Sequence, residues 1–361
     1  MSEGRDAGGL ALQRELLARV SRTFALTIPA LPDRLERVVG NAYLLCRIAD
    51  TIEDASSLEP RGGFEFFCER FVAVVAGRGD AAAFARDFAP RLAPEATADE
   101  RRLIAETPRV LAVTAGFEPA ERAALAECVD VMAHGMAEFH RTRSVDGLAD
   151  LAEHSRYCYV VAGCVGEMLT RLFLIQVPEI ASRRDELMRL AVSFGQCLQM
   201  TNILKDFWED RSRGACWLPR DVFVAEGVDL ARVAPGDPRL ARGFRGLVAV
   251  AQGHARRALD FVLAIPRRES GIRNFCLWAL FMAVLTQRKL LARPGFASGA
   301  EVKIRRSTVR LVVAGCRLGA RSDAALRASF ALASRGLPRA PAELVAANSS
   351  ASGREGARVS S

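Results

Sequence analysis

The residues best suited to chemistry are acids spaced by one helical turn near residue 50. Asp50 and Asp54 stand four positions apart with Glu53 between them, and the chain from Tyr43 to Asp54 contains neither Gly nor Pro. This Leu- and Ile-rich composition predicts a helix, on which Tyr43 and Arg47 share one face with the two aspartates. Like charges one turn apart destabilise an isolated helix, so this face indicates a bound cation.

The same pattern recurs far along the chain. Asp206 and Asp210 have the same spacing, and Glu209 holds the corresponding place between them. Gln199 and Asn202 fall on the same helical face as these two aspartates. We call Asp50, Glu53 and Asp54 the first acidic motif, and Asp206, Glu209 and Asp210 the second.

A single acidic turn is most often a solvated surface. Two matched motifs, each on an otherwise apolar helix, are better explained by chemistry that requires clustered carboxylates. Carboxylate oxygens are hard ligands, which favour Mg²⁺ over zinc. We therefore predict that all six acids of the two motifs are metal ligands and that the chemistry involves a diphosphate.

The composition predicts an all-α protein. Half of the 361 residues are apolar, and β-branched residues seldom alternate with polar ones. This length suffices for a large core, in one domain or in two closely packed ones. We predict a domain over 10–335, with disorder in 1–9 and in the Pro-, Ala-, Ser- and Gly-rich stretch 336–361.

The net charge limits the possible classes of partner, and the cysteines indicate the cellular compartment. The net charge is +8, almost all from arginine, which suits anionic phosphates or a membrane face. No nucleic-acid-binding motif is present, so we expect no nucleic-acid partner. Nine dispersed cysteines without a CxxC pair indicate reduced, buried thiols and a cytoplasmic protein. The sequence gives no indication of the oligomeric state.

No segment is predicted to cross a membrane. The polar residues 1–6 lack the apolar core of a signal peptide. The longest strongly apolar run, Phe275 to Leu285, is too short to span a bilayer and is predicted to be a buried helix. We expect at most a peripheral association with the inner face of the membrane.

Six blocks of sequence resemble the squalene/phytoene synthase family of head-to-head prenyltransferases, and its squalene synthase branch most closely. They follow in matching order from about Ser21 to Arg306. The blocks are Ser21–Phe24, Tyr43–Asp54, Tyr157–Gly166, Gln199–Asp210, Phe275–Cys276 and Val302–Arg306. The resemblance implies an isoprenoid-synthase-type helical bundle with a central cavity. The resemblance is to the bacterial type, for which we expect no membrane anchor after the last block.

The resemblance implies roles for residues outside the acidic motifs. Ser21 and Arg22 would contact a diphosphate, assisted by Arg47 and Lys205. Arg213 would be a further phosphate-binding arginine. Substrate contacts implied in this way or by the shared faces are Ser21, Arg22, Phe24, Tyr43, Arg47, Gln199, Asn202, Lys205, Arg213 and Phe275, of which Phe24 and Phe275 would line the prenyl pocket.

Two further groups are assigned by resemblance alone. Tyr157 would take part in catalysis, either by passing a proton or by stabilising a carbocation through its ring. Its neighbours Ala162, Gly163 and Gly166 fit either tight helix packing or a ligand wall. Lys303, Arg305 and Arg306 would bind the phosphates of NADPH.

The resemblance implies the condensation of two farnesyl diphosphates to squalene through presqualene diphosphate, with Mg²⁺ and NADPH. A dehydrosqualene or phytoene synthase, which omits the reduction, shares every acidic residue. Formation of presqualene diphosphate alone is a further alternative. A non-catalytic scaffold would be expected to lose metal ligands, and here both motifs are complete.

Overall fold

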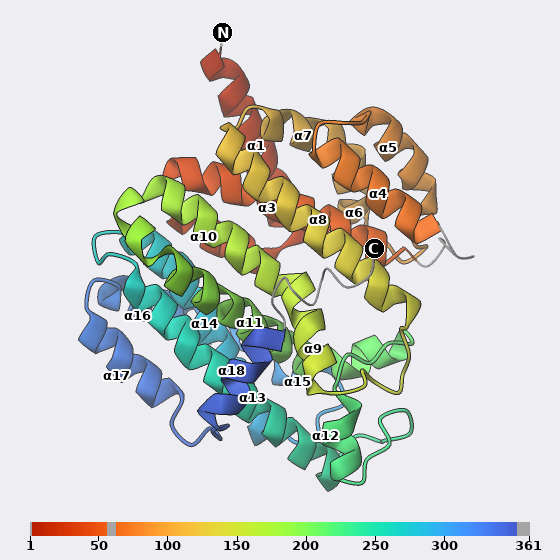
Figure 1. The fold of residues 1–361 in the computed structure, drawn as a ribbon, viewed down its shortest axis with the longest axis vertical. Coiled ribbons are helices and arrows are strands. Elements are labelled where there is room, and N and C mark those ends of the chain that lie inside the picture. Colours follow the sequence, from red (N-terminus) through yellow and green to blue (C-terminus); the bar gives the residue numbers. More distant parts are fainter. Residues whose placement is uncertain (1, 56–62, 352–361) are drawn as a thin grey trace. The chain divides into compact units, whose positions relative to one another are not determined.

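The computed structural model describes residues 2–55 and 63–351, and this part of the chain is helical without a β-strand (Figure 1). The prediction of an all-α protein is confirmed. The helices before residue 142 are α1 (Ser2–Val20), α2 (Arg22–Thr27), α3 (Asp33–Glu53), α4 (Gly63–Val75), α5 (Ala81–Phe88), α6 (Ala98–Ala105), α7 (Thr107–Ala115) and α8 (Pro119–Arg141). The later helices are α9 (Leu151–Cys158), α10 (Cys164–Gln176), α11 (Arg184–Ser212), α12 (Arg220–Ala225), α13 (Pro238–Ala264), α14 (Ser270–Ala292), α15 (Gly299–Val302), α16 (Arg306–Gly319), α17 (Asp323–Ala333) and α18 (Ala342–Ala351).

The chain divides into two compact units. The first comprises Met1–Arg141 with Met168–Pro178, and the second comprises Thr142–Glu167 with Glu179–Ser361. In the first unit α3 packs against α1, α7 and α8, and in the second α11 packs against α13 and α14. Each acidic motif therefore lies on the helix at the centre of its own unit. The predicted domain boundaries and the central cavity remain predictions.

Both predicted disordered ends contain helix in the described residues. Helix α1 already begins at Ser2, because buried Leu12, Leu16 and Leu17 anchor it and a helix extends from such an anchor residue by residue. Helix α18 packs against α9 and α13 in the region predicted to be disordered, with Val345 4% exposed. The prediction for residues 1 and 352–361 lies outside the described residues.

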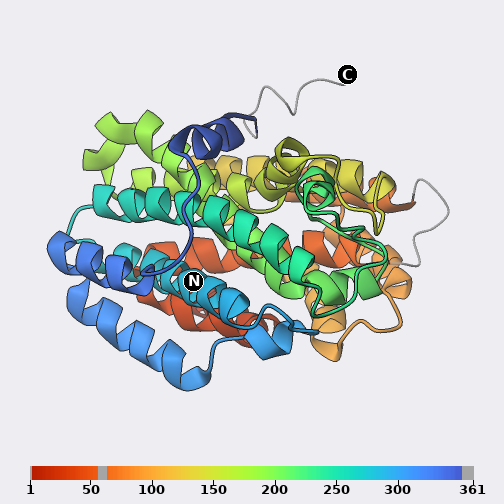
Figure 2. The same cartoon turned by 90° about the horizontal axis from the view of Figure 1, so that it is seen from below.

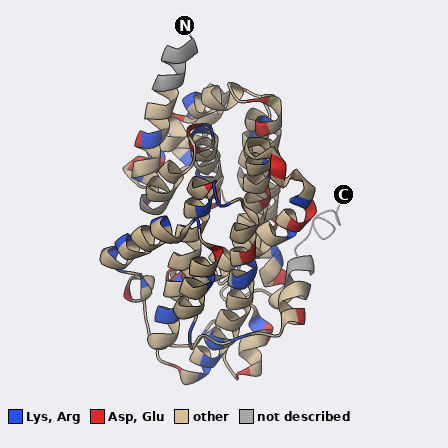
Figure 3. Ribbon diagram, turned by 90° about the vertical axis from the view of Figure 1, so that its left-hand side faces the viewer, with Lys and Arg blue, Asp and Glu red and all other residues tan. Residues whose placement is uncertain are grey.

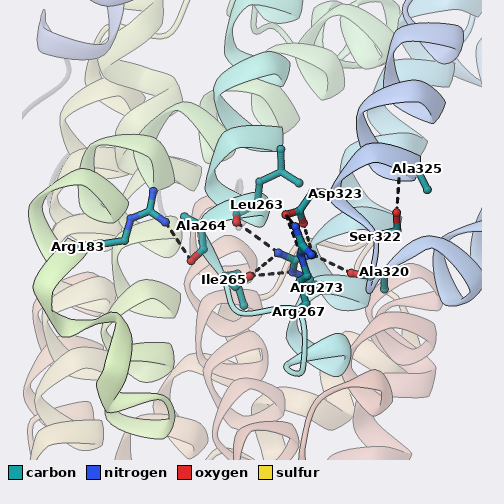
Figure 4. A network of polar contacts seen from close by, with 10 residues as sticks. All are labelled: Arg183, Leu263, Ala264, Ile265, Arg267, Arg273, Ala320, Ser322, Asp323 and Ala325. Atoms are coloured by element: carbon teal, nitrogen blue, oxygen red, sulfur yellow. Dashed lines mark hydrogen bonds and ion pairs between the residues drawn. The ribbon is translucent and has the colours of Figure 1, made fainter.

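One buried arginine joins the ends of four helices in the second unit (Figure 4). Arg273, 1% exposed, donates to the carbonyl oxygens of Ile265 and Ala320 at 2.6–2.9 Å and forms an ion pair of 2.8 Å with Asp323. These carbonyl groups follow α13 and α16, where helices leave acceptors without intrahelical partners. The junction fixes α16 and α17, which lie side by side in Figures 1 and 2.

Among the described residues, two helical stretches are long and apolar enough to cross a membrane, judged by length and composition alone: Leu151–Gln176 and Ser270–Ala292. The second contains the run Phe275–Leu285. The helix is longer than that run, so the expectation that it is too short to span is corrected. Its apolar window is 61% buried inside the protein, as predicted for a core helix. None of the nine cysteines, all of which lie in the described residues, forms a disulfide, and eight of them are buried.

Backbone contact, allowed by glycine, holds α11 against the turn that precedes α10. The chain from Tyr159 to Gly163 forms one π-helical turn beside α11. A Cβ added to Gly195 would overlap the carbonyl of Ala162, and one added to Gly166 would overlap that of Ala191. Tight helix packing, one of the two interpretations of these small residues, is therefore confirmed.

Replacing Gly195 with alanine tests this contact. We expect Gly195→Ala to lower the free energy of unfolding by about 2–3 kcal/mol, because neither backbone can retreat from the added methyl group. The matched control is Gly315→Ala in α16, where no atom lies within 4 Å of the added Cβ. It should raise the free energy of unfolding by about 0.5–1 kcal/mol. Equal denaturant midpoints for the two variants would contradict the assignment.

Candidate active site

The first acidic motif lies at the C-terminal end of α3. Asp50 and Glu53 occupy its last turn, Asp54 is the C-cap residue, and no basic residue is present in that turn. The end of a helix carries partial negative charge from its unpaired carbonyl groups. Three carboxylates at this position raise the local negative potential further, so the motif attracts a cation.

Arg47, one turn before the first acidic motif, forms an ion pair with Asp50. Its guanidinium lies 3.8 Å from the carboxylate of Asp50 and also donates to Glu100. Burial raises the pKa of Asp50 to about 6, although Arg47 opposes the shift. Arg47 thus divides its charge between two acids, and the Asp50 carboxylate is incompletely compensated.

The predicted diphosphate and prenyl contacts of the first unit lie together. Ser21 caps α2 by accepting a hydrogen bond from the Phe24 backbone N–H at 3.1 Å, and its hydroxyl also bonds to Tyr43. The rings of Phe24 and Tyr43 are 4.7 Å apart. Tyr43 is one turn before Arg47 on α3, so these residues form a continuous surface with the first acidic motif. The Arg22 side chain lies outside the described side chains.

The second acidic motif lies near the C-terminal end of α11. Lys205 forms an ion pair with Asp206, and Arg213 donates to Asp210 at 2.7 Å. Burial raises the pKa of Asp210, although Arg213 opposes the shift. Lys205 and Arg213 are both predicted to bind phosphate. In this structure they neutralise two of the predicted metal ligands.

Glu209, the third acid of this motif, is held by the backbone of a distant segment. Its Oε1 accepts a hydrogen bond of 2.8 Å from the N–H of Gly299, whereas its Oε2 is buried and has no hydrogen-bond partner. The adjacent Trp208 donates to the carbonyl oxygen of Phe296 at 2.7 Å. The segment from Phe296 to Gly299 therefore packs directly on the acidic end of α11.

The predicted NADPH block follows that segment without interruption. Helix α15 begins at Gly299, and Lys303, Arg305 and Arg306 come directly after it. All three side chains are exposed, and none forms an ion pair with an acid of the described residues. The backbone thus links the second acidic motif to a set of available cations. Figure 3 shows that elsewhere blue and red residues are interspersed along the helices of both units.

Tyr157 lies in α9 against the loop that follows α11. It is 4% exposed and stacks on Trp217, with 4.2 Å between ring centroids and 11° between planes. His154 Nδ1 donates to the Trp217 carbonyl oxygen at 2.6 Å, and burial lowers the pKa of His154 to about 4. A neutral histidine therefore holds the tryptophan in place below the tyrosine.

The other predicted contacts differ in exposure. Asn202 is exposed on α11 and Gln199 is half-buried one turn earlier. Phe275 is buried in α14, 6% exposed. A cavity of about 460 Å³ in the first unit is lined by Asp33 and Phe117 among others, at the beginning of α3, and so is not the predicted site.

Comparison with known proteins gives the family. The sequence model described as squalene/phytoene synthase matches residues 17–308. The chain belongs to this family. As a member of the squalene/phytoene synthase family it is an enzyme of the prenyltransferase class.

Curated relatives agree with this assignment. The chain is 27% identical over 315 residues to the squalene synthase of Eremothecium gossypii, covering 83% of this chain and 67% of that protein. It is 28% identical over 335 residues to the squalene synthase of Candida albicans, covering 87% and 68%. The chain thus spans about two thirds of the length of these relatives.

The similar solved structures establish the fold. A TcSQS–ligand complex aligns with a TM-score of 0.69 at 21% identity, covering 95% of this chain and 97% of that one. A dehydrosqualene synthase aligns with a TM-score of 0.64 at 19% identity, covering 88% and 98%. The predicted isoprenoid-synthase-type bundle is therefore confirmed as a fold.

The donor set in this squalene/phytoene synthase family member fits Mg²⁺. No three His, Cys, Asp or Glu side chains of the described residues are already gathered closely enough to hold a metal. The donors are nonetheless carboxylate oxygens, and a cation would stabilise the buried, unpartnered Oε2 of Glu209. Burial also raises the pKa of Asp50 and that of Asp210, and a bound cation would favour the charged form of both.

Sequence reasoning missed two residues of the site. Glu100 shares Arg47 with Asp50, and Gly299 holds Glu209. The Thr97–Glu100 capping box was readable as a helix start, but not as a partner of α3, because the sequence separation hides the contact. Nothing in the sequence around Gly299 distinguishes it from other glycines.

Replacing Glu209 with glutamine separates stability from ligand binding. Without metal, Glu209→Gln should raise the free energy of unfolding by about 1 kcal/mol, because it removes a buried charge without a partner and keeps the Oε1 bond to Gly299. It should weaken binding of Mg²⁺ with inorganic pyrophosphate at least about tenfold, measured by calorimetry.

The matched control is Glu301→Gln. Glu301 also accepts one backbone N–H, that of Ala297 at 2.9 Å, but is exposed. It should leave both quantities unchanged. A Glu209→Gln protein that is less stable and binds as tightly as the parent would show that Oε2 is not a metal ligand.

Proposed function

We propose that the chain is a squalene synthase. It joins two farnesyl diphosphates head to head, first to presqualene diphosphate, and then reduces that intermediate with NADPH to squalene. The names of the curated relatives support the reaction. The observation that carries the proposal is the Gly299–Glu209 hydrogen bond, which links the second acidic motif to the basic block Lys303–Arg306 in one backbone segment.

The acids and cations would exchange partners when substrate binds. Magnesium held by Asp50, Glu53, Asp54, Asp206, Glu209 and Asp210 would supply positive charge to the leaving pyrophosphate. Lys205 and Arg213, which neutralise Asp206 and Asp210 in this structure, would then be available to donate to diphosphate oxygens. Arg47 would make the same change beside Asp50.

The first half of the reaction breaks the C1–O bond of one farnesyl diphosphate, and pyrophosphate leaves with the electron pair. The double bond of the second molecule captures the allylic cation, and loss of a proton closes the cyclopropane ring. Phe24 and Phe275 would line the apolar pocket and exclude water from that cation. Tyr157, stacked on Trp217, offers either a phenol for the proton or a ring face for the cation.

The second half breaks the remaining C–O bond, and a hydride from NADPH quenches the rearranged cation. Lys303, Arg305 and Arg306 would hold the phosphates of the cofactor, and their exposure and lack of acidic partners support this role. We further propose a cytoplasmic enzyme that works at the inner face of the membrane, where its insoluble product can leave.

A dehydrosqualene synthase is the second candidate. The structural likeness to one such enzyme favours it, and it needs the same acids. The two candidates differ in the use of the basic block. Phytoene synthesis from longer substrates, release of presqualene diphosphate and a scaffold role remain alternatives that a product assay distinguishes.

The assay incubates the purified protein with farnesyl diphosphate and Mg²⁺, with and without NADPH. We expect squalene only in the presence of NADPH. Replacing Lys303, Arg305 and Arg306 together with glutamine should leave farnesyl diphosphate consumption in place and divert the product to dehydrosqualene or presqualene diphosphate. Arg232→Gln, a change at an 88% exposed arginine that pairs with Asp229, is the control.

Asp54→Asn and Asp210→Asn should each lower consumption of farnesyl diphosphate by about a hundredfold or more, because each removes charge at the leaving group. Dehydrosqualene as the sole product of the parent protein, whatever the NADPH concentration, would replace the squalene assignment with the second candidate. Unchanged turnover in both asparagine variants would remove the catalytic assignment altogether.

A further inference from the structure

Helix α16 exposes two leucines on one face. The Leu311 side chain is 73% exposed and that of Leu318 is 89% exposed, and they stand seven residues apart, two helical turns. The opposite face of α16 packs against α14, with Cys316 buried. Exposed apolar side chains that share one helix face are typical of a surface that meets a partner or a membrane.

A row of arginines follows one edge of this apolar stripe. At about 100° per residue, Arg310 and Arg317 lie on the same side of the line through Leu311 and Leu318. Arg321, exposed just beyond the helix, continues the row. From Val302 to Ser322 the chain has six Lys or Arg residues and no Asp or Glu. The stripe and the row together form what we call the α16 surface.

We propose that the α16 surface docks the protein on a membrane that contains anionic lipid. An amphipathic helix with leucines toward the acyl boundary and arginines toward the headgroups is the arrangement that binds in the plane of a bilayer interface. Arg310 and Arg321 would meet lipid phosphates while Leu311 and Leu318 enter the headgroup boundary. The guanidinium of Arg317 lies 5.4 Å from the ring centroid of Trp278 and adds positive charge to the same edge.

The positive charge of the α16 surface favours a membrane over the other possible occupants, a second copy of this chain or another segment of it. Two copies of the α16 surface would bring like charges together, which disfavours a symmetric dimer through this face. Helix α18 packs instead on α9 and α13.

The Arg273 junction makes this helix a rigid platform. Arg273 binds the Ala320 carbonyl oxygen at the end of α16 and Asp323 at the start of α17. Because the helix is fixed before any membrane is met, docking does not require it to fold, and little ordering entropy is lost.

The experiment is flotation of the purified protein with vesicles of phosphatidylcholine alone and of an equimolar mixture with phosphatidylglycerol. We expect binding to the mixed vesicles, weakening as salt is added, and little binding to phosphatidylcholine. Leu311→Gln and Leu318→Gln keep helix propensity and should each lower the partition coefficient about tenfold. Arg310→Gln and Arg321→Gln should each lower it about fivefold.

Val224→Gln is the matched control. Val224 is 62% exposed on α12 but lies between Asp221 and Glu226, so its replacement should leave vesicle binding unchanged. Circular dichroism establishes that each variant is folded. No flotation with the mixed vesicles, or flotation of Leu311→Gln and Leu318→Gln equal to that of the parent, would overturn the proposal. A concentration-dependent dimer lost in the leucine variant would assign the surface to self-association. The product assay is independent of these outcomes.

Discussion

The arrangement of charge at the ends of α3 and α11 is the constraint on which the rest depends. Each helix places acids of its motif at or near its C-terminal end, where the backbone already contributes negative potential. Such a concentration persists only if cations compensate it. In this structure Arg47, Lys205 and Arg213 do so in part, and the buried Oε2 of Glu209 remains without a partner.

This constraint extends into neighbouring segments. Because Glu209 takes a hydrogen bond from Gly299, the loop after α14 must pass close to α11, and only glycine fits there. A Cβ at that position would lie 2.9 Å from both Asp206 Oδ1 and the Lys205 carbonyl oxygen. The basic block follows Gly299 in the same short segment of backbone, and this segment would join the two halves of the proposed reaction.

The sequence predicted the parts of the site that repeat or are local. Helical spacing gave both acidic faces, and composition gave the all-α fold. The contacts of Glu100 and Gly299 escaped prediction because they join residues distant in sequence through a single hydrogen bond each. The helix near the C-terminal end was missed for a similar reason, since α18 packs on α9 and α13, and Val345 lies against Gly253 of α13. Local composition there favours disorder, and tertiary packing overrides it.

The central claim is that both acidic motifs serve one metal–diphosphate cluster. A crystal structure with Mg²⁺ and a non-ionisable analogue of farnesyl diphosphate tests it most directly. The account predicts that Asp50, Asp54, Asp206 and Asp210 share magnesium ions around the diphosphates, with Lys205 and Arg213 turned from their aspartates to phosphate oxygens. Motifs that bind separate ions, or cations that keep their present carboxylate partners, would contradict it.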